Sequence, residues 1–116
     1  MKLQEVYDFI NEISPFELQE SWDNSGLIVG RMSDEVERIV VTLDVDSQMI
    51  DEAEEGTLFV VHHPLIFGGL NRIDYDTYPS NLLAKIIRKN QSMIAAHTNF
   101  DQTHLCLLYT SPSPRD

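Results

Sequence analysis

The feature that most limits the fold is a continuous run at residues 57–61, Thr-Leu-Phe-Val-Val, which ends at His62. Its β-branched and aromatic side chains predict a β-strand. Because the run has no alternating polar face for solvent, it is typical of a strand in a parallel sheet that is covered on both faces. We therefore expect this strand to lie inside a layered fold, between helices.

The remainder of the chain alternates between helical and extended patterns. Apolar residues recur at helical spacing from Leu3 to Ile13, and Asp46 is placed to cap a later helix that Gly56 ends. This alternation predicts an α/β protein with a layered α/β/α architecture and a mostly parallel sheet. The predicted helices cover residues 3–13, 14–20, 47–55 and 82–89, and the predicted strands cover 27–29, 38–43, 57–61 and 92–96, with the strand at 38–43 buried.

The composition limits the classes of partner. The chain has 116 residues, which suits one domain, and it contains no apolar run long enough to span a bilayer. Its 8 Lys and Arg residues face 19 Asp and Glu residues, so the net charge is −11. A sequence-independent grip on nucleic acid needs clustered cations, and this composition argues against one. The N-terminus lacks the apolar stretch of a signal peptide, so we expect a cytoplasmic protein without a membrane partner.

Residues 106–116 do not continue the α/β pattern. They read Cys-Leu-Leu-Tyr-Thr-Ser-Pro-Ser-Pro-Arg-Asp and resemble the translation of a sequencing-library adapter. A segment of that origin takes no part in a fold. The alternative is a natural Ser/Pro-rich tail, which its composition would leave disordered. In both cases we expect residues 1–105 to form the folded part and residues 106–116 to be disordered.

Potential metal ligands follow two of the predicted strands. His62 and His63 come directly after the apolar run, and His97 and Asp101 follow the last predicted strand. In parallel sheets ligands gather beyond the carboxyl ends of the strands, so these side chains are expected at one edge of the sheet. A set of imidazole and carboxylate ligands favours zinc, iron, manganese or nickel over calcium.

The sequence does not fix how these ligands are arranged around one or two ions. Adjacent residues on an extended strand point to opposite faces, so His62 and His63 would share one ion only if the backbone turned between them. One economical arrangement gives each histidine its own ion, with Asp101 as a carboxylate bridge between two ions about 4 Å apart. His97 is then either a further ligand or a group that orients a ligand.

Three segments together resemble one protein family. They are Trp-Asp-Asn-Ser-Gly-Leu at residues 22–27, Val-His-His-Pro at 61–64 and Ala-His-Thr-Asn-Phe-Asp at 96–101. In this order they are similar to the Nif-three-like family (NGG-interacting factor three), whose members are often described as GTP cyclohydrolase I type 2 homologues. The resemblance covers residues 1–105.

The resemblance implies a layered α/β protein with a dinuclear metal centre, assembled as a toroidal homohexamer. It implies that His62, His63 and Asp101 are metal ligands, with His97 in the same motif as a ligand or as a neighbour that orients one. The family completes its centre with a His-x-x-x-Glu motif near the C-terminus, which this chain lacks. We therefore expect residues 1–105 to be the N-terminal half of the family domain, with two divalent ions per subunit only in an intact parent.

Two classes of function fit these expectations. The first is a metal-dependent hydrolase acting on a nucleotide-like substrate, with little or no activity in this N-terminal fragment. The alternative is a non-catalytic metal-binding protein or an interaction scaffold. The sequence has no nucleotide-binding fingerprint, so it does not identify the substrate. The ligand types do not identify a single metal. Among the other motif residues, Trp22 is predicted to be a packing anchor rather than a ligand contact. Asp23 and Asn24 are predicted to form a turn, and the family motif leaves room for a role at the cleft.

Overall fold

A four-stranded sheet forms the centre of the molecule in the computed structural model, which describes residues 1–66 and 70–99. The strands lie in the order β1-β4-β3-β2. β2, β3 and β4 are parallel, and β1 pairs antiparallel with β4 at one edge, so the prediction of a mostly parallel sheet is confirmed. The predicted tail at residues 106–116 lies outside the described residues. The strands are β1 (Gly26–Val29), β2 (Arg38–Thr42), β3 (Thr57–Val61) and β4 (Ser92–Ala95).

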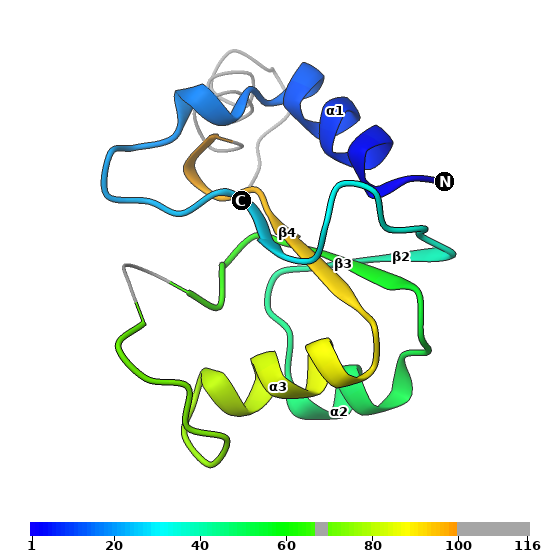
Figure 1. Cartoon of the computed structure of the whole chain (residues 1–116). Coiled ribbons are helices and arrows are strands. Elements are labelled where there is room, and N and C mark those ends of the chain that lie inside the picture. The colour runs from blue at the N-terminus through cyan, green and yellow to red at the C-terminus, as the bar shows by residue number, and fades with distance from the viewer. Residues whose placement is uncertain (67–69, 100–116) are drawn as a thin grey trace, which may run out of the picture.

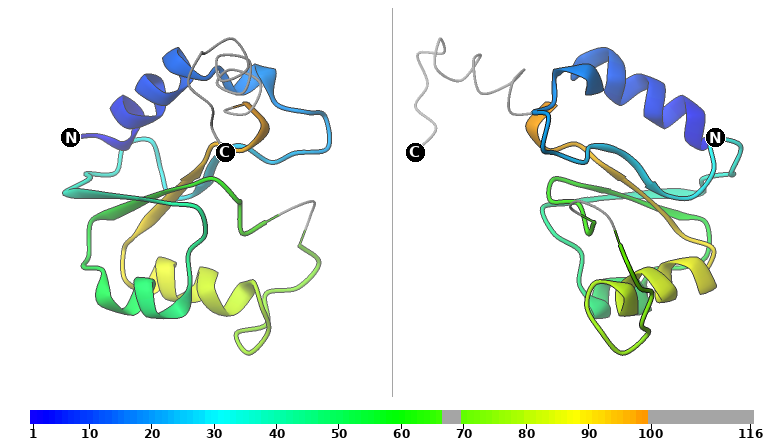
Figure 2. Two further views of the ribbon diagram at one scale, coloured as in Figure 1. Left: turned by 180° about the vertical axis from the view of Figure 1, so that it is seen from behind. Right: turned by 60° about the vertical axis from the view of Figure 1, so that its left-hand side comes forward.

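Helices cover both faces of the sheet. Figure 1 shows α1 on one side of the sheet and α2 and α3 together on the other, and the two views in Figure 2 agree. The predicted layered α/β architecture is therefore confirmed. No helix in the described ranges is long and apolar enough to cross a membrane. The helices are α1 (Leu3–Ile13), α2 (Ser47–Glu52) and α3 (Ser80–Arg88), and a short 3-10 helix, η1 (Phe16–Leu18), follows α1.

The two faces of the sheet carry separate hydrophobic cores. Phe59 and Val61 of β3 belong to the core beside α2 and α3, whereas Leu58 and Ile94 belong to the core beneath α1. None of these four side chains is more than 1% exposed. Because strand residues alternate between faces, only a strand covered on both sides can bury consecutive apolar residues in this way. The prediction that residues 57–61 form a central, buried strand is confirmed.

The strand predicted at residues 38–43 forms as β2, but the prediction that it is buried was wrong. β2 is an edge strand, and its Ile39 and Val41 side chains are 44% and 77% exposed. Both share the α1 face of the sheet with Leu58, yet no residue of β2 belongs to the described core beneath α1. An apolar run predicts a strand, whereas its position at an edge or in the centre depends on which strands pair.

α2 is capped as the sequence predicts but ends earlier. The Asp46 side chain accepts a 2.8 Å hydrogen bond from the Met49 amide, as an N-cap residue does. The helix then ends at Glu52, short of the predicted boundary. Lys89, which follows α3, donates to the backbone carbonyl of Asp51 at 2.7 Å. This tertiary contact satisfies a carbonyl at the helix end, and the local sequence pattern does not encode it.

The segment after α1 forms only η1, and the prediction of a capped α-helix there was wrong. Ser14 ends α1 instead of starting the next helix, because its amide donates to the Ile10 carbonyl at 2.8 Å. The Asn11 side chain accepts a 2.9 Å hydrogen bond from the Phe16 amide and so takes the capping role expected of Ser14. Tyr7 stacks on Phe16 with ring centroids 4.6 Å apart. These contacts hold the segment against α1.

Two neighbouring residues of α3 give a matched test of the packing. Ile86 is fully buried, whereas Ile87 is 61% exposed. Ile86→Ala leaves a cavity, so the free energy of unfolding should fall by about 2–5 kcal/mol. Ile87→Ala should change it by less than about 1 kcal/mol. Urea denaturation measures both values, and equal losses in the two variants would contradict the packing described here.

Candidate metal centre

The candidate ligands lie at the carboxyl edge of the sheet. His62 and His63 follow β3, and His97 lies just beyond the end of β4. The backbone pairing continues past the strands, since the Ala96 amide donates to the Val61 carbonyl at 2.9 Å. Because β3 and β4 are parallel, both ligand segments leave the sheet at the same edge, as the sequence predicts.

Three imidazole rings form a compact cluster at this edge. His62, His63 and His97 each offer one ring nitrogen, and these nitrogens all lie within 4.8 Å of one another. The ring centroid of His62 lies 4.9 Å from that of His63 and 4.8 Å from that of His97. The backbone bends at His62 and His63 after β3 has ended. That bend provides the turn that two adjacent histidines need in order to face one site.

The structure therefore brings together part of the predicted ligand set. His62 and His63 converge, and His97, predicted to be a ligand or an orienting group, is a third member of the same cluster. Asp101 lies outside the described residues, and its role as a bridging ligand stays a prediction. Within the described part of the chain, the candidate centre is a set of three imidazoles.

A buried carboxylate holds the third ring. Asp23 lies in the loop before β1, and its side chain is 0% exposed. One carboxylate oxygen lies 3.1 Å from Nδ1 of His97. The other accepts hydrogen bonds from the backbone amide and the hydroxyl group of Thr98, at 2.9 and 2.5 Å. Asp23 thus joins the loop before β1 to the segment that follows β4.

Residues 22–25 form the loop that contains Asp23, and we call it the Asp23 loop. Its other residues also contact both ligand segments. The Ser25 hydroxyl accepts a 3.0 Å hydrogen bond from the His97 amide and lies 3.3 Å from the Asp23 carboxylate, to which it donates. The Asn24 side chain donates to the Ile66 carbonyl at 2.8 Å, in the segment that follows His63. The Asp23 loop therefore braces the two histidine-bearing segments against each other.

These hydrogen bonds stabilise the charged form of Asp23. Burial alone would raise the pKa of the carboxyl group, because water no longer solvates the charge. Hydrogen bonds from the Thr98 hydroxyl, the Thr98 amide, the Asn24 amide and the His97 ring outweigh burial and lower the pKa to about 2. Asp23 is therefore a carboxylate at neutral pH despite its burial.

His63 has a carboxylate partner in a different setting. Its Nδ1 lies 2.9 Å from Oδ1 of Asp44, in the segment that follows β2. Both side chains are open to solvent, with 46% of His63 and 70% of Asp44 exposed. Because water competes for an exposed pair, Asp44 restrains the His63 ring less than a buried partner would.

Sequence reasoning did not identify either carboxylate as part of the site. Asp23 was predicted to form a turn, and the family motif left room for a role at the cleft, but its contact with His97 was not predicted. No local pattern relates Asp44 to His63, since their contact depends on the pairing of β2 with β3. The prediction that Trp22 is a packing anchor was wrong: the residue is 61% exposed, and its ring meets His97 edge-on at 6.1 Å between centroids.

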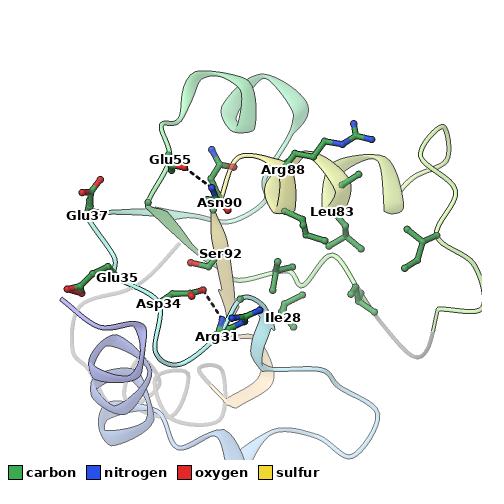
Figure 3. Close-up of a pocket in the computed structure, with 18 of the residues that line it drawn as sticks. Ile28, Arg31, Asp34, Glu35, Glu37, Glu55, Leu83, Arg88, Asn90 and Ser92 are labelled. Atoms are coloured by element: carbon green, nitrogen blue, oxygen red, sulfur yellow. Dashed lines mark hydrogen bonds between the residues drawn. The ribbon is translucent and has the colours of Figure 1, made fainter.

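A separate groove lies away from the histidines. It has a volume of about 990 Å³ and opens between α3, the β1 edge and the loop that contains Tyr75 (Figure 3). None of the three clustered histidines lines it. Two of its carboxylates already have partners: Glu55 accepts from Asn90 at 2.7 Å, and Asp34 accepts from the Arg31 amide at 2.9 Å. Among the described residues, the group of three side chains close enough to hold one metal ion lies at the histidine cluster and not in this groove.

The Asp23 contacts predict a pH-dependent contribution to stability. A folded-state pKa of about 2, against an ordinary value of 3.8, corresponds to about 2 kcal/mol. Because the folded-state pKa is the lower one, this stability is present above about pH 4 and is lost as the pH falls toward about 2. Urea unfolding measures the free energy of unfolding of the wild type and of Asp23→Asn at about pH 5 and about pH 2.5. Most of the difference in free energy between the two proteins at about pH 5 should be lost at about pH 2.5. An unchanged difference would contradict these contacts.

Solved structures contain the same arrangement of elements. Staphylococcus aureus protein SA1388 superposes with a TM-score of 0.80 at 32% identity, over 87% of this chain and 33% of that one. A Bacillus cereus protein related to NIF3 gives a TM-score of 0.77 at 29% identity, over 87% and 28% of the two chains. Reduced HcgD from Methanocaldococcus jannaschii gives 0.80 at 27% identity, over 99% and 49%. The chain is similar in fold to a part of each protein.

Curated relatives extend the similarity to sequence. The GTP cyclohydrolase 1 type 2 homolog of Campylobacter jejuni is 46% identical over 95% of this chain and 46% of its own length. GTP cyclohydrolase 1 type 2 of Helicobacter pylori is 48% identical over 89% of this chain and 42% of its own length. The chain therefore spans less than half the length of these relatives. The model of the Duf34/NIF3 family (NGG1p interacting factor 3) matches residues 1–107, and this chain belongs to that family.

Proposed function

We propose that this chain supplies part of a divalent-metal site, and that the site serves a metal-dependent hydrolase in a longer parent protein. One observation carries the proposal: ring nitrogens of His62, His63 and His97 lie within 4.8 Å of one another at the carboxyl edge of the sheet. Imidazole suits zinc, iron and nickel, and an added carboxylate would also suit manganese. We therefore propose zinc, iron, manganese or nickel as the bound metal.

The cluster fits an ion after modest side-chain movement. Two imidazole nitrogens on one tetrahedral zinc ion lie about 3.4 Å apart, given zinc–nitrogen bonds of about 2.0–2.1 Å. The nitrogens here lie within 4.8 Å of one another, so they need to approach by about 1.4 Å at most. Rotation of the His62 and His63 rings about their side-chain bonds can supply that movement. His62, His63 and His97 would then hold the ion from two adjacent strand ends.

Carboxylates behind the rings also support a metal site. Metal-binding histidines usually place their second ring nitrogen against a carboxylate, a backbone carbonyl or water. Asp23 contacts Nδ1 of His97 at 3.1 Å, and Asp44 contacts Nδ1 of His63 at 2.9 Å. Two of the three rings therefore have the support that metal-binding histidines use, and both partners add negative charge beside a cation.

A dinuclear centre is our proposal for the intact parent. One closed tetrahedral site uses four ligands, and the described part of the chain gathers three imidazoles. Asp101, in the same motif as His97, is the proposed bridge between two ions. Further ligands would come from the region of the relatives that extends beyond the match, which covers 46% of the Campylobacter jejuni protein. A homohexameric parent, implied by the family resemblance, belongs to the same proposal.

The proposed reaction follows from the metal site and from the names of the relatives. A divalent ion at such a site supplies a Lewis acid and an activated water molecule, which suits hydrolysis. A cavity of about 460 Å³ opens beside His63 and Asp44, so a small substrate can approach the cluster from that side. The Helicobacter pylori relative is named GTP cyclohydrolase 1 type 2. We therefore propose a cytoplasmic parent that hydrolyses a nucleotide-like compound.

Metal binding by this chain is the first test. Calorimetric titration of chelator-stripped protein with zinc or manganese should show one bound ion per chain. His63→Ala and His97→Ala should each weaken binding by more than about 10-fold, because each removes a ligand. His104→Ala is the matched control, since His104 belongs to neither ligand motif. Absence of binding by the wild type would refute the metal assignment, and unchanged binding by His97→Ala would remove His97 from the ligand set.

The reaction is tested in a relative of full length. The Campylobacter jejuni protein, stripped of metal and then reloaded, should hydrolyse GTP only in its loaded form. Replacing the residue that aligns with His63 by alanine should abolish turnover, because His63 is a proposed ligand. Tight metal binding without turnover of GTP or other nucleotides would instead favour the alternative, a non-catalytic metal-binding protein or an interaction scaffold.

A further inference from the structure

We infer that Asp23 is a positioning residue for the metal site: its buried carboxylate fixes the tautomer and the orientation of the His97 ring, so that Nε2 is left as the ligand atom. The inference rests on the proposed metal-binding function. It concerns a residue that would not touch the ion and would act only through His97. The contact that carries it is the 3.1 Å distance between Asp23 Oδ1 and His97 Nδ1.

The tautomer follows from the chemistry of that contact. A carboxylate can only accept hydrogen bonds, so His97 Nδ1 must carry the proton that lies between the two groups. A neutral imidazole has one ring proton, and the other nitrogen then keeps its lone pair. Asp23 therefore selects the form of His97 in which Nε2 can bind a metal ion.

The orientation follows from how firmly Asp23 is held. Its second oxygen accepts hydrogen bonds from the Thr98 amide and hydroxyl, and Ser25 donates to the same oxygen. The His97 backbone is fixed as well, because its amide donates to the Ser25 hydroxyl at 3.0 Å. With 0% of the Asp23 side chain and 15% of the His97 side chain exposed, water cannot replace these contacts easily.

A turn-forming role alone does not account for this carboxylate. Asparagine forms the same kind of turn without charge, and burying a charge is costly unless hydrogen bonds compensate for it. The chain nevertheless buries Asp23, surrounds it with donors and aims one oxygen at the ring of a clustered histidine. A carboxylate is always a hydrogen-bond acceptor toward Nδ1. A neutral asparagine side chain would not guarantee this, because its amide group can also donate.

The chain contains its own control for this inference. Asp44 contacts Nδ1 of His63 at 2.9 Å, so the two carboxylate–imidazole pairs are alike in their contact. They differ in burial, since 70% of Asp44 and 46% of His63 are exposed. If burial and bracing make Asp23 a positioning residue, removing the charge of Asp44 must have a much smaller effect on metal binding.

Zinc affinity is the first measurement. Asp23→Asn should weaken zinc binding by about 10–100-fold, the usual effect of removing a partner that orients a metal-binding histidine. Asp44→Asn should weaken it by less than about 3-fold, because water already competes for that pair. Thr98→Val, which removes one hydrogen bond to Asp23 but leaves the contact with His97, should weaken zinc binding by less than Asp23→Asn does. Equal affinities of Asp23→Asn and Asp44→Asn would overturn the inference.

The tautomer of His97 is the second measurement, and it needs no metal. Long-range ¹H–¹⁵N spectra of the metal-free protein distinguish the two tautomers when the imidazole rings are neutral. At such a pH they should show His97 protonated at Nδ1 in the wild type and in Thr98→Val. In Asp23→Asn the Nε2–H form should become populated. An Nε2–H ring in zinc-binding wild-type protein would overturn the inference even if Asp23→Asn failed to fold. Absence of zinc binding by the wild type would instead overturn the proposed function on which the inference rests.

Discussion

The parallel pairing of β3 with β4 is the constraint on which the rest of the structure depends. Its register places Val61 beside Ala95, so the two segments that carry the imidazoles leave the sheet side by side. Antiparallel pairing would send those segments to opposite edges, and the three rings could not meet. Because each face of these strands packs into its own hydrophobic core, a slip of one strand by one residue would move each of its side chains to the opposite face and disrupt both cores. The hydrophobic layers therefore fix the spacing of the candidate ligands.

β1, the antiparallel strand of the described sheet, adds the Asp23 loop to the candidate site. Gly26, the first residue of β1, pairs with Ala95, the last residue of β4. The start of β1 consequently lies at the edge where β4 ends, and the Asp23 loop that precedes it reaches the ring of His97. Figure 1 shows this loop approaching the end of β4 from the α1 side. A parallel β1 would have carried the loop to the opposite edge and left His97 without its buried partner.

The parts of this fold that could be predicted from the sequence are those set by local pattern. The apolar run at residues 57–61 and the helical spacing of α1 depend on near neighbours, and both elements form with the predicted boundaries. The exposure of Val41 and the early end of α2 depend on tertiary partners and were not predictable in this way. At the candidate site, His62, His63 and His97 were singled out because they follow predicted strands, and the structure places their rings in one cluster. The Asp23 partnership was missed because it joins residues 74 positions apart in the chain.

We propose that imidazoles from two adjacent strand ends bind one divalent ion. X-ray absorption at the zinc edge of the stoichiometrically loaded chain tests it most directly, because imidazole rings give a characteristic multiple-scattering signal. We predict about three imidazole nitrogens at about 2.0–2.1 Å from zinc, and one fewer in His97→Ala. A first shell made only of oxygen atoms, or a spectrum unchanged by that substitution, would contradict the account.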